Sequence, residues 1–262
     1  MAPDAATVSE NLREAMRFFG RARREGEIRD LPALTVISSG VDYGVFNAAV
    51  LCASLNGDVG ALSRQMDESA DFYRAKNLPW SFWACDDLIG ETRGPLRGVL
   101  ERHSLRHITT APGMVAEALA SPVRALPRME VREVSDGPTR TAFSHVTAVA
   151  FDIPFAVCDA VYGAGRGWGG SLRGWVGYQE GRPICTTATI AWAGVIGIYS
   201  VGTLPAWQRR GYAEAVMRHA IERTRASAAS NGIVLQSTRA GLRLYERMGF
   251  RAVTSIHVFL SR

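Results

Sequence analysis

The stretch 200-SVGTLPAWQRRGYAEAVMRHAI-221 decides the fold of this chain. An apolar run typical of a strand ends at Gly202, a short loop follows, and Gln208-Arg-Arg-Gly211 leads into an amphipathic helix pattern. The first turn of a helix has unpaired N–H groups and partial positive charge, which favour anions. A glycine there lets a bulky phosphate approach the backbone. On the loop alone, a phosphate site and a plain strand-to-helix turn with solvated arginines both remain open.

A second motif narrows this choice. Residues 208–213 fit the pattern Q/R-x-x-G-x-G/A, with Ala213 in place of the second glycine, and 243-RLYERMGF-250 follows after a further helix and strand. Together the two motifs resemble the GCN5-related N-acetyltransferase (GNAT) superfamily, which binds acetyl-CoA. The resemblance is clear over residues 127–262, and the anion that it implies is the pyrophosphate of CoA.

Hydrophobic periodicity along the chain predicts alternating helices and strands. The helices are expected within residues 9–28, 57–77, 96–103, 138–151, 154–165, 211–229 and 240–249. The strands are expected within 31–40, 78–87, 104–114, 129–135, 232–237 and 250–260, with three more in 172–202 separated by turns at Glu180-Gly181 and Ala193-Gly194. The resemblance implies an α/β fold of the acyl-CoA N-acyltransferase type, with a mixed central sheet flanked by helices.

Two prolines within residues 120–128 interrupt the pattern and suggest a boundary between tandem halves. We expect residues 1–125 to form a degenerate GNAT-like half and residues 126–262 to form the acetyl-CoA-binding catalytic domain. A short internal repeat pairs 99-VLERHSLRHIT-109 with 244-LYERMGFRAVT-254, which puts Leu100 where Tyr245 stands. The first half also lacks the phosphate-loop pattern, so one working cofactor site is expected. The first half either shapes the acceptor pocket or mainly buries surface.

The resemblance also implies roles for individual residues. Backbone N–H groups of residues 209–213 would hold the pyrophosphate, and the strand ending at Thr203 would splay and pair with the pantetheine arm. The Val201 amide would stabilise the thioester oxyanion, and Tyr245 would protonate the departing thiolate. Thr238 stands where many family members carry an asparagine. The implied cofactor-binding residues are Val201, Gly202, Thr203, Gln208, Arg209, Arg210, Gly211, Tyr212, Ala213, Thr238 and Tyr245, and the catalytic ones are Tyr245 and Val201.

A general base is not identified by the sequence. Tyr178, Glu180, Tyr199 and His257 have suitable side chains, but each is typical of a structural or solvent-facing position, and none is assigned. The four cysteines lie far apart and are interpreted as buried reduced thiols. No third ligand accompanies His103 and His107, so a metal site is not expected.

Composition narrows the class of protein. The chain of 262 residues is 47% hydrophobic and 21% charged, which is typical of a soluble globular protein. It shows no apolar run of about 18 residues and no signal-peptide layout, so we expect a cytoplasmic protein without a membrane span. The net charge of +5 comes almost wholly from arginine. The arginines are dispersed and no nucleic-acid-binding motif accompanies them, so nucleic acid is a weak alternative partner.

These observations predict an enzyme of the N-acetyltransferase type. Acetyl-CoA would be the co-substrate, and the acetyl group would pass directly to an amine of a small molecule or a peptide. The alternatives are a non-catalytic acyl-CoA-binding or sensor protein, and an acyltransferase that prefers a longer acyl-CoA. A homo-oligomer is compatible with the sequence.

Overall fold

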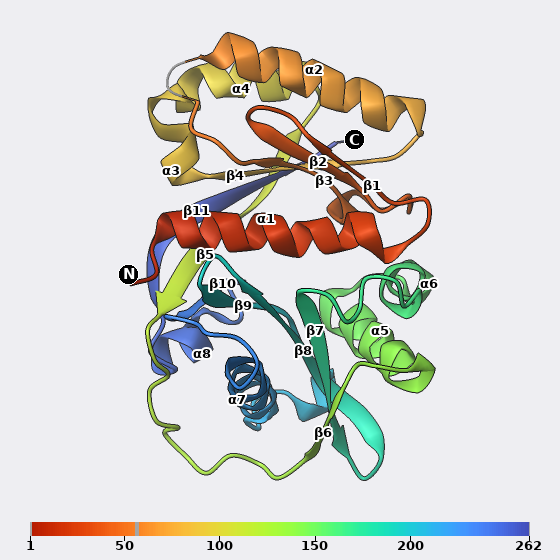
Figure 1. Cartoon of the computed structure of the whole chain (residues 1–262), viewed down its shortest axis with the longest axis vertical. Coiled ribbons are helices and arrows are strands. Elements are labelled where there is room, and N and C mark those ends of the chain that lie inside the picture. The colour runs from red at the N-terminus through yellow and green to blue at the C-terminus, as the bar shows by residue number, and fades with distance from the viewer. Residues whose placement is uncertain (1, 56–57, 262) are drawn as a thin grey trace.

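A computed structural model describes residues 2–55 and 58–261 of the chain. In this part of the chain, eleven strands form one mixed sheet in the order β1-β2-β3-β4-β11-β5-β10-β9-β8-β7-β6 (Figure 1). The strands are β1 (Glu27–Asp30), β2 (Leu34–Ser38), β3 (Asn47–Leu51), β4 (Ser81–Cys85), β5 (Arg106–Ala116), β6 (Glu130–Glu133), β7 (Leu172–Gln179), β8 (Arg182–Trp192), β9 (Val195–Thr203), β10 (Ile233–Gln236) and β11 (Arg251–Leu260). The predicted α/β class with a mixed sheet is confirmed.

The sheet runs without a break across the boundary that we placed at residues 120–128. The C-terminal strand β11 pairs antiparallel with β4 on one side and with β5 on the other. β10 pairs antiparallel with β5 and parallel with β9. The last strand of the chain therefore lies among strands that come from the first half.

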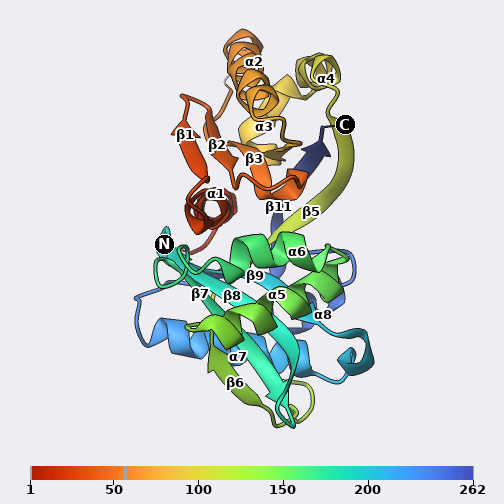
Figure 2. The same cartoon turned by 90° about the vertical axis from the view of Figure 1, so that its right-hand side faces the viewer.

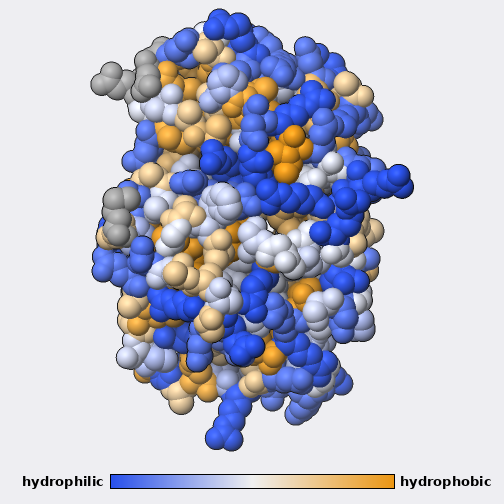
Figure 3. Space-filling model, viewed as in Figure 1, coloured by the Kyte–Doolittle hydropathy of each residue, from blue (hydrophilic) through white to orange (hydrophobic). Residues whose placement is uncertain are grey.

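Helices cover both faces of this sheet (Figures 1 and 2). The α-helices are α1 (Ala5–Ala22), α2 (Val59–Ala75), α3 (Asp86–Ile89), α4 (Arg93–Arg102), α5 (Gly137–Phe151), α6 (Phe155–Cys158), α7 (Tyr212–Arg225) and α8 (Leu242–Arg247). The shorter helical turns are η1 (Gly44–Phe46), η2 (Gly90–Thr92), η3 (Asp159–Gly163) and η4 (Pro205–Trp207). Hydrophilic residues dominate the face seen in Figure 3, with smaller apolar areas between them.

The long helix α1 packs on strands from both halves of the chain. It packs against β1, β2 and β3 and also against β8, β9 and β10. Its Asn11 is buried and donates from Nδ2 to the carbonyls of Ile190 and Trp192, at 3.3 and 3.0 Å. The Tyr199 hydroxyl donates to Asn11 Oδ1 at 2.7 Å. One buried amide therefore holds the N-terminal helix on strands of the second half.

Local sequence explains most element ends. Asp4 and Asp136 cap α1 and α5 through capping boxes with the threonine three residues later. The two predicted hairpin turns are confirmed, because Glu180-Gly181 and Ala193-Gly194 connect β7 to β8 and β8 to β9. All four residues have positive φ, which these tight turns require.

The other predicted elements are present, but several ends differ. The helix predicted over 9–28 ends at Ala22, and residues 27–28 of that range belong to strand β1. Residues 86–87 of the strand predicted over 78–87 begin α3, and strand β3 was not predicted. Residue 57, the first of the helix predicted over 57–77, lies outside the described residues, and α2 begins at Val59. Helix α7 ends at Arg225 and not at 229, since the Ala226 N–H already donates to the carbonyls of Glu222 and Thr224 at a tightened C-terminus. The repeat that we noted corresponds to two helix-to-strand units, α4–β5 and α8–β11, whose strands pair with each other.

Candidate functional site

Strands β9 and β10 diverge beside the segment 200–221. They pair only over Ile196–Ile198 and Ile233–Leu235, and β9 then continues to Thr203 without β10 beside it. On its other edge β9 stays paired with β8 as far as Thr203. One edge of the last five residues of β9 is therefore open. This is what we expected of a strand that splays from its neighbour.

The backbone groups at this open edge can be assigned from the strand alternation. The N–H of Leu204, the residue after β9, donates to the carbonyl of Ile184 in β8 at 2.9 Å. Because successive residues of a strand direct their N–H groups to opposite edges, those of Val201 and Thr203 face the open side. A bulge precedes them, where Ser200 has φ 49° and the pairing with β8 shifts register. Bulges of this kind re-aim the backbone.

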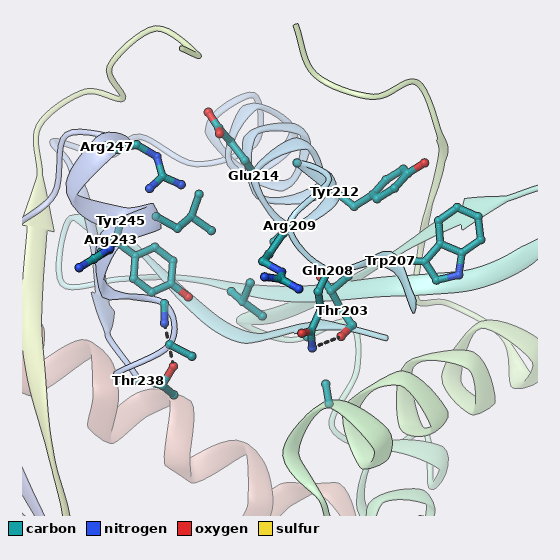
Figure 4. A pocket seen from close by; sticks show the side chains of 18 of the residues that line it. Thr203, Trp207, Gln208, Arg209, Tyr212, Glu214, Thr238, Arg243, Tyr245 and Arg247 are labelled. Carbon is teal, nitrogen blue, oxygen red and sulfur yellow. Dashed lines mark hydrogen bonds between the residues drawn. The ribbon is translucent and has the colours of Figure 1, made fainter. Parts of the chain in front are cut away.

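A cavity of about 850 Å³ occupies the space where the strands diverge (Figure 4). It lies between the end of β9, the loop after it, the first turn of α7 and helix α8. The residues predicted from sequence that line it are Val201, Gly202, Thr203, Gln208, Arg209, Gly211, Tyr212, Ala213, Thr238 and Tyr245. Arg210 is not among the lining residues, and its guanidinium lies over the Trp207 ring at 5.5 Å.

The first turn of α7 presents unpaired N–H groups at this cavity. Gly211 is the N-cap residue in a left-handed conformation, with φ 91°, and no side chain caps the helix. A Cβ at Gly211 would meet Pro127 Cδ at 3.1 Å, so both the backbone and the space favour glycine. The N–H groups of the residues that follow have no acceptor within the helix.

Arginines surround the cavity. Arg209, Arg243 and Arg247 line it (Figure 4). Arg124 reaches it from the linker, where its Nη2 donates to the Arg209 carbonyl at 3.1 Å. Among the described residues that line the cavity, Glu214 is the one carboxylate, and it is held 2.8 Å from the guanidinium of Arg218. The cavity therefore carries a positive charge that suits a polyanion.

Some of these cations were missed from the sequence. Arg243 and Arg247 are four residues apart in "RLYERMGF", so they share one face of a helix, and this spacing could have revealed them. Arg124 lies outside any element and comes to the cavity only through the path of the linker.

Tyr245 lies at the inner end of the cavity. Its side chain is 7% exposed, and a Cβ on Gly241 would lie 2.6 Å from its ring, so the glycine allows the ring to pack against the backbone. Burial raises the pKa of the phenol to about 12. The hydroxyl points into the cavity (Figure 4) and makes no hydrogen bond within the described chain. The phenol is therefore protonated and available to a ligand at neutral pH.

A second cavity, of about 380 Å³, continues from the first behind Tyr245. The two share Phe151, Val201, Thr238 and Tyr245. The first half of the chain contributes one wall, which includes Leu12, Ala15, Met16, Phe18, Phe19, Val45, Phe46, Trp83, Thr109 and Ala111. The first half therefore shapes a pocket and does not only bury surface.

Comparison with known families identifies the region that holds these motifs. Residues 170–252 match the family described as acetyltransferase (GNAT) domain. The chain carries a GNAT domain. This match includes the end of β9, the uncapped helix α7 and Tyr245, so the resemblance that was drawn from the two motifs is confirmed.

Solved structures show that the whole chain has the GNAT fold. A GCN5-related N-acetyltransferase from Kribbella flavida aligns with a TM-score of 0.72 at 16% identity and covers 100% of this chain and 96% of its own. A GCN5-related N-acetyltransferase-like protein from Streptococcus suis aligns at 0.57 and 14% identity, covering 96% of this chain and 98% of its own. One from Sphaerobacter thermophilus aligns at 0.55 and 16% identity, covering 99% and 94%. Comparison with curated proteins gives no match.

The side chains considered as general bases are dispersed around the GNAT domain and its neighbouring strands. Tyr178 lies under the Arg132 guanidinium at 4.4 Å, and Glu180 lies in a hairpin turn. His257 Nε2 is 2.6 Å from Asp86 Oδ1 and lines a separate cavity. Only Tyr199 lines the cavity behind Tyr245, and burial raises the pKa of its phenol far above the ordinary value.

The first half has a counterpart of the open cleft, but the counterpart is closed. Like β9 and β10, strands β3 and β4 are parallel neighbours. After them the chain closes the gap, since Leu55 is buried and its N–H donates to the Leu88 carbonyl at 3.3 Å. Leu100, at the place of Tyr245 in the repeat, packs in the core of this half.

None of the helices in the described part of the chain has the length and apolar character needed to span a membrane.

Proposed function

We propose that this protein transfers an acetyl group from acetyl-CoA directly to an amine. The observation that carries the proposal is the junction of three features in one cavity: an open strand edge at Val201 and Thr203, the uncapped start of α7, and the phenol of Tyr245. The GNAT match over residues 170–252 supports acyl transfer as the reaction class.

The charge around the cavity supports binding of the phosphate end of CoA there. In the proposal, the N–H groups of residues 209–213 bind the pyrophosphate, and Gln208 opens this loop. The guanidinium groups of Arg209, Arg243 and Arg247 add charge at the same place. Figure 4 shows Gln208 Nε2 donating to the Thr203 carbonyl at 3.1 Å. This hydrogen bond would give way if the pantetheine arm paired with Thr203.

The reacting end would lie where the two cavities meet. The Val201 amide, at the open edge, would donate to the thioester oxygen as negative charge develops there. Tyr245 would donate its proton to the sulfur as the thiolate leaves. Thr238 lines both cavities, and its Oγ1 accepts from the Gly241 N–H at 3.2 Å, so it also holds the start of α8.

The division of the chain into residues 1–125 and 126–262 remains part of this proposal. Every residue that we assign to acetyl-CoA comes from the second segment, while the first contributes a wall of the inner cavity. Because β11 of the second segment lies between β4 and β5 of the first, the two segments share one sheet.

A binding and transfer experiment tests the proposal. Calorimetry and thermal shift with CoA, acetyl-CoA and longer acyl-CoA esters should show binding, and CoA release with a panel of amines should show transfer. Arg209→Ala should weaken CoA binding several-fold. Arg210→Ala is the matched control, because the Arg210 side chain is not among those that line the cavity, although the Trp207 ring that it contacts is. Absence of binding by every CoA ester would refute the proposal, and binding without transfer would favour a sensor.

A further inference from the structure

The inner cavity, behind Tyr245, is lined mainly by rings and aliphatic side chains. Phe18 and Tyr162 are stacked with their ring centroids 5.7 Å apart, and Phe19 and Phe46 lie 4.8 Å apart. A volume of about 380 Å³ is within the range of small-molecule pockets. The apolar lining suits an apolar ligand body, such as one that carries an aromatic ring.

Charged groups are scarce in this lining. Among the described residues that line the inner cavity, Arg239 is the one with a full charge, and none is Asp, Glu, His or Lys. Burial raises the pKa of the phenols of Tyr162 and Tyr199, so both stay neutral. The Tyr199 hydroxyl is already committed to Asn11. An ammonium ion in this cavity would lose its hydration without a carboxylate to replace it.

Two uncharged polar atoms in the lining are short of hydrogen bonds, and both residues line the inner cavity. Thr147 Oγ1 is buried without a partner, and Gln236 Nε2 is buried with only the phenol of Tyr199 as a neighbour to bond. Buried polar atoms are rarely left unpaired in folded proteins. An uncharged polar group of a ligand would satisfy them.

We infer that the acceptor is an amine that is uncharged at neutral pH and is carried on an apolar body, as in an amine bonded directly to an aromatic ring. This inference rests on the proposed acetyl transfer. It explains why the described residues that line the cavity include no carboxylate or histidine: an amine that binds neutral has no proton to lose before it attacks.

The proton balance of the reaction closes without such a base. The amine nitrogen forms a bond to the acetyl carbon, and the carbon–sulfur bond breaks with its electron pair on sulfur. Tyr245 gives its proton to that sulfur, which yields the free thiol. The proton that the nitrogen releases as it becomes an amide restores the phenol. No other reactant is needed.

A pair of amines of similar size tests the inference in the full-length protein. Aniline is neutral at pH 7, whereas cyclohexylamine resembles a lysine amine, of which only about one molecule in 10³ is neutral there. We expect kcat/KM to be at least about tenfold higher for aniline and nearly constant from about pH 6 to 9. Equal or higher kcat/KM for cyclohexylamine, or a rise of about tenfold per pH unit with aniline, would overturn it.

Calorimetry makes the test independent of turnover. Aniline should bind to the protein with CoA present, and cyclohexylamine should bind at least about tenfold more weakly at pH 7. If acetyl-CoA binds and only flexible alkylamines or peptide amines are acetylated, this inference fails and the proposed function stands. If no CoA ester binds, the proposed function fails, and binding of aniline still decides the nature of the cavity.

A charge placed in the cavity provides the sharper test. Gln236→Glu keeps the side-chain shape and adds a carboxylate beside the acceptor. It should shift the ratio of kcat/KM toward cyclohexylamine by about tenfold or more. Gln179→Glu is the matched control, because Gln179 Oε1 is buried without a partner but lies outside this cavity. An equal shift in both variants, or none in Gln236→Glu, would contradict the inferred acceptor.

Discussion

Replacing Tyr245 by phenylalanine removes one oxygen from the place where the two cavities meet. The hydroxyl has no hydrogen-bond partner in residues 2–55 and 58–261, and the ring would keep its contact with Phe250 at 6.0 Å. We therefore expect the melting temperature at pH 7 to be unchanged within error. General acid catalysis by a positioned side chain contributes about 10² to 10⁴, so kcat should fall by at least about 10²-fold. The Kd for CoA should stay within about twofold, since the loop and α7 are untouched.

The same substitution has a signature at alkaline pH. Burial raises the pKa of Tyr245 from 10.0 to about 12 in the folded protein. Because the folded value is the higher one, its contribution to stability is complete below pH 10 and is lost as the pH rises through 12. The loss amounts to about 1.4 kcal/mol for each pH unit in that window. Tyr245→Phe lacks this term and should lose less stability than the wild type above pH 10.

Urea denaturation at neutral and alkaline pH, together with stopped CoA-release assays and calorimetry, measures all these quantities. Tyr178→Phe is the matched control, because burial also raises the pKa of that phenol but it lines neither cavity. Equal turnover of Tyr245→Phe and the wild type would refute the proton-donor role. Parallel losses in CoA affinity and turnover would instead assign the hydroxyl to binding.

Glycine substitutions give three further predictions. Gly211→Ala forces a side chain into φ 91° against Pro127, so it should cost about 1–2 kcal/mol in urea denaturation and weaken CoA binding in calorimetry. Gly98→Ala, in the exposed interior of α4 with open space around it, should instead raise the free energy of unfolding by about 0.5–1 kcal/mol. Gly197→Ala would place a Cβ 1.8 Å from Asn11 Oδ1, so it should destabilise by more than about 2 kcal/mol. A neutral effect of Gly197→Ala would contradict the packing of α1 on β9.

The sequence predicts the elements well where the local pattern is strong. The hairpin turn at Glu180-Gly181 and the N-terminus of α5 both depend on residues adjacent in the chain, and both are where the pattern puts them. The partners of β11 could not be predicted in this way. Its alternating pattern fits any sheet with one covered face, and its insertion between β4 and β5 depends on contacts far apart in sequence.

The candidate site likewise has one part that could be predicted from the sequence and one part that could not. The residues from Val201 to Ala213 form one continuous segment with a recognisable pattern, and the structure brings all of them except Pro205, Ala206, Leu204 and Arg210 to the cavity. The inner cavity has no such segment. Its walls come from many elements of both halves, among them α1, η1, α5 and β9, and most of these residues look like ordinary core in the sequence.

The closed cleft and the inner cavity together suggest what the first half contributes. Where its own parallel strands end, the Leu55 N–H donates to the Leu88 carbonyl and Leu55 is buried, so the backbone edge there is occupied by the chain itself. Its helix α1, by contrast, is fixed across β9 by Asn11, and this places Phe18 and Phe19 opposite the reacting end of the proposed site. A half that only buried surface would need neither a buried amide at the seam nor aromatic rings facing a cavity. We therefore expect substitutions in α1 to change which acceptor is preferred while the affinity for CoA stays the same. In that case the first half recognises the acceptor and the second half recognises CoA.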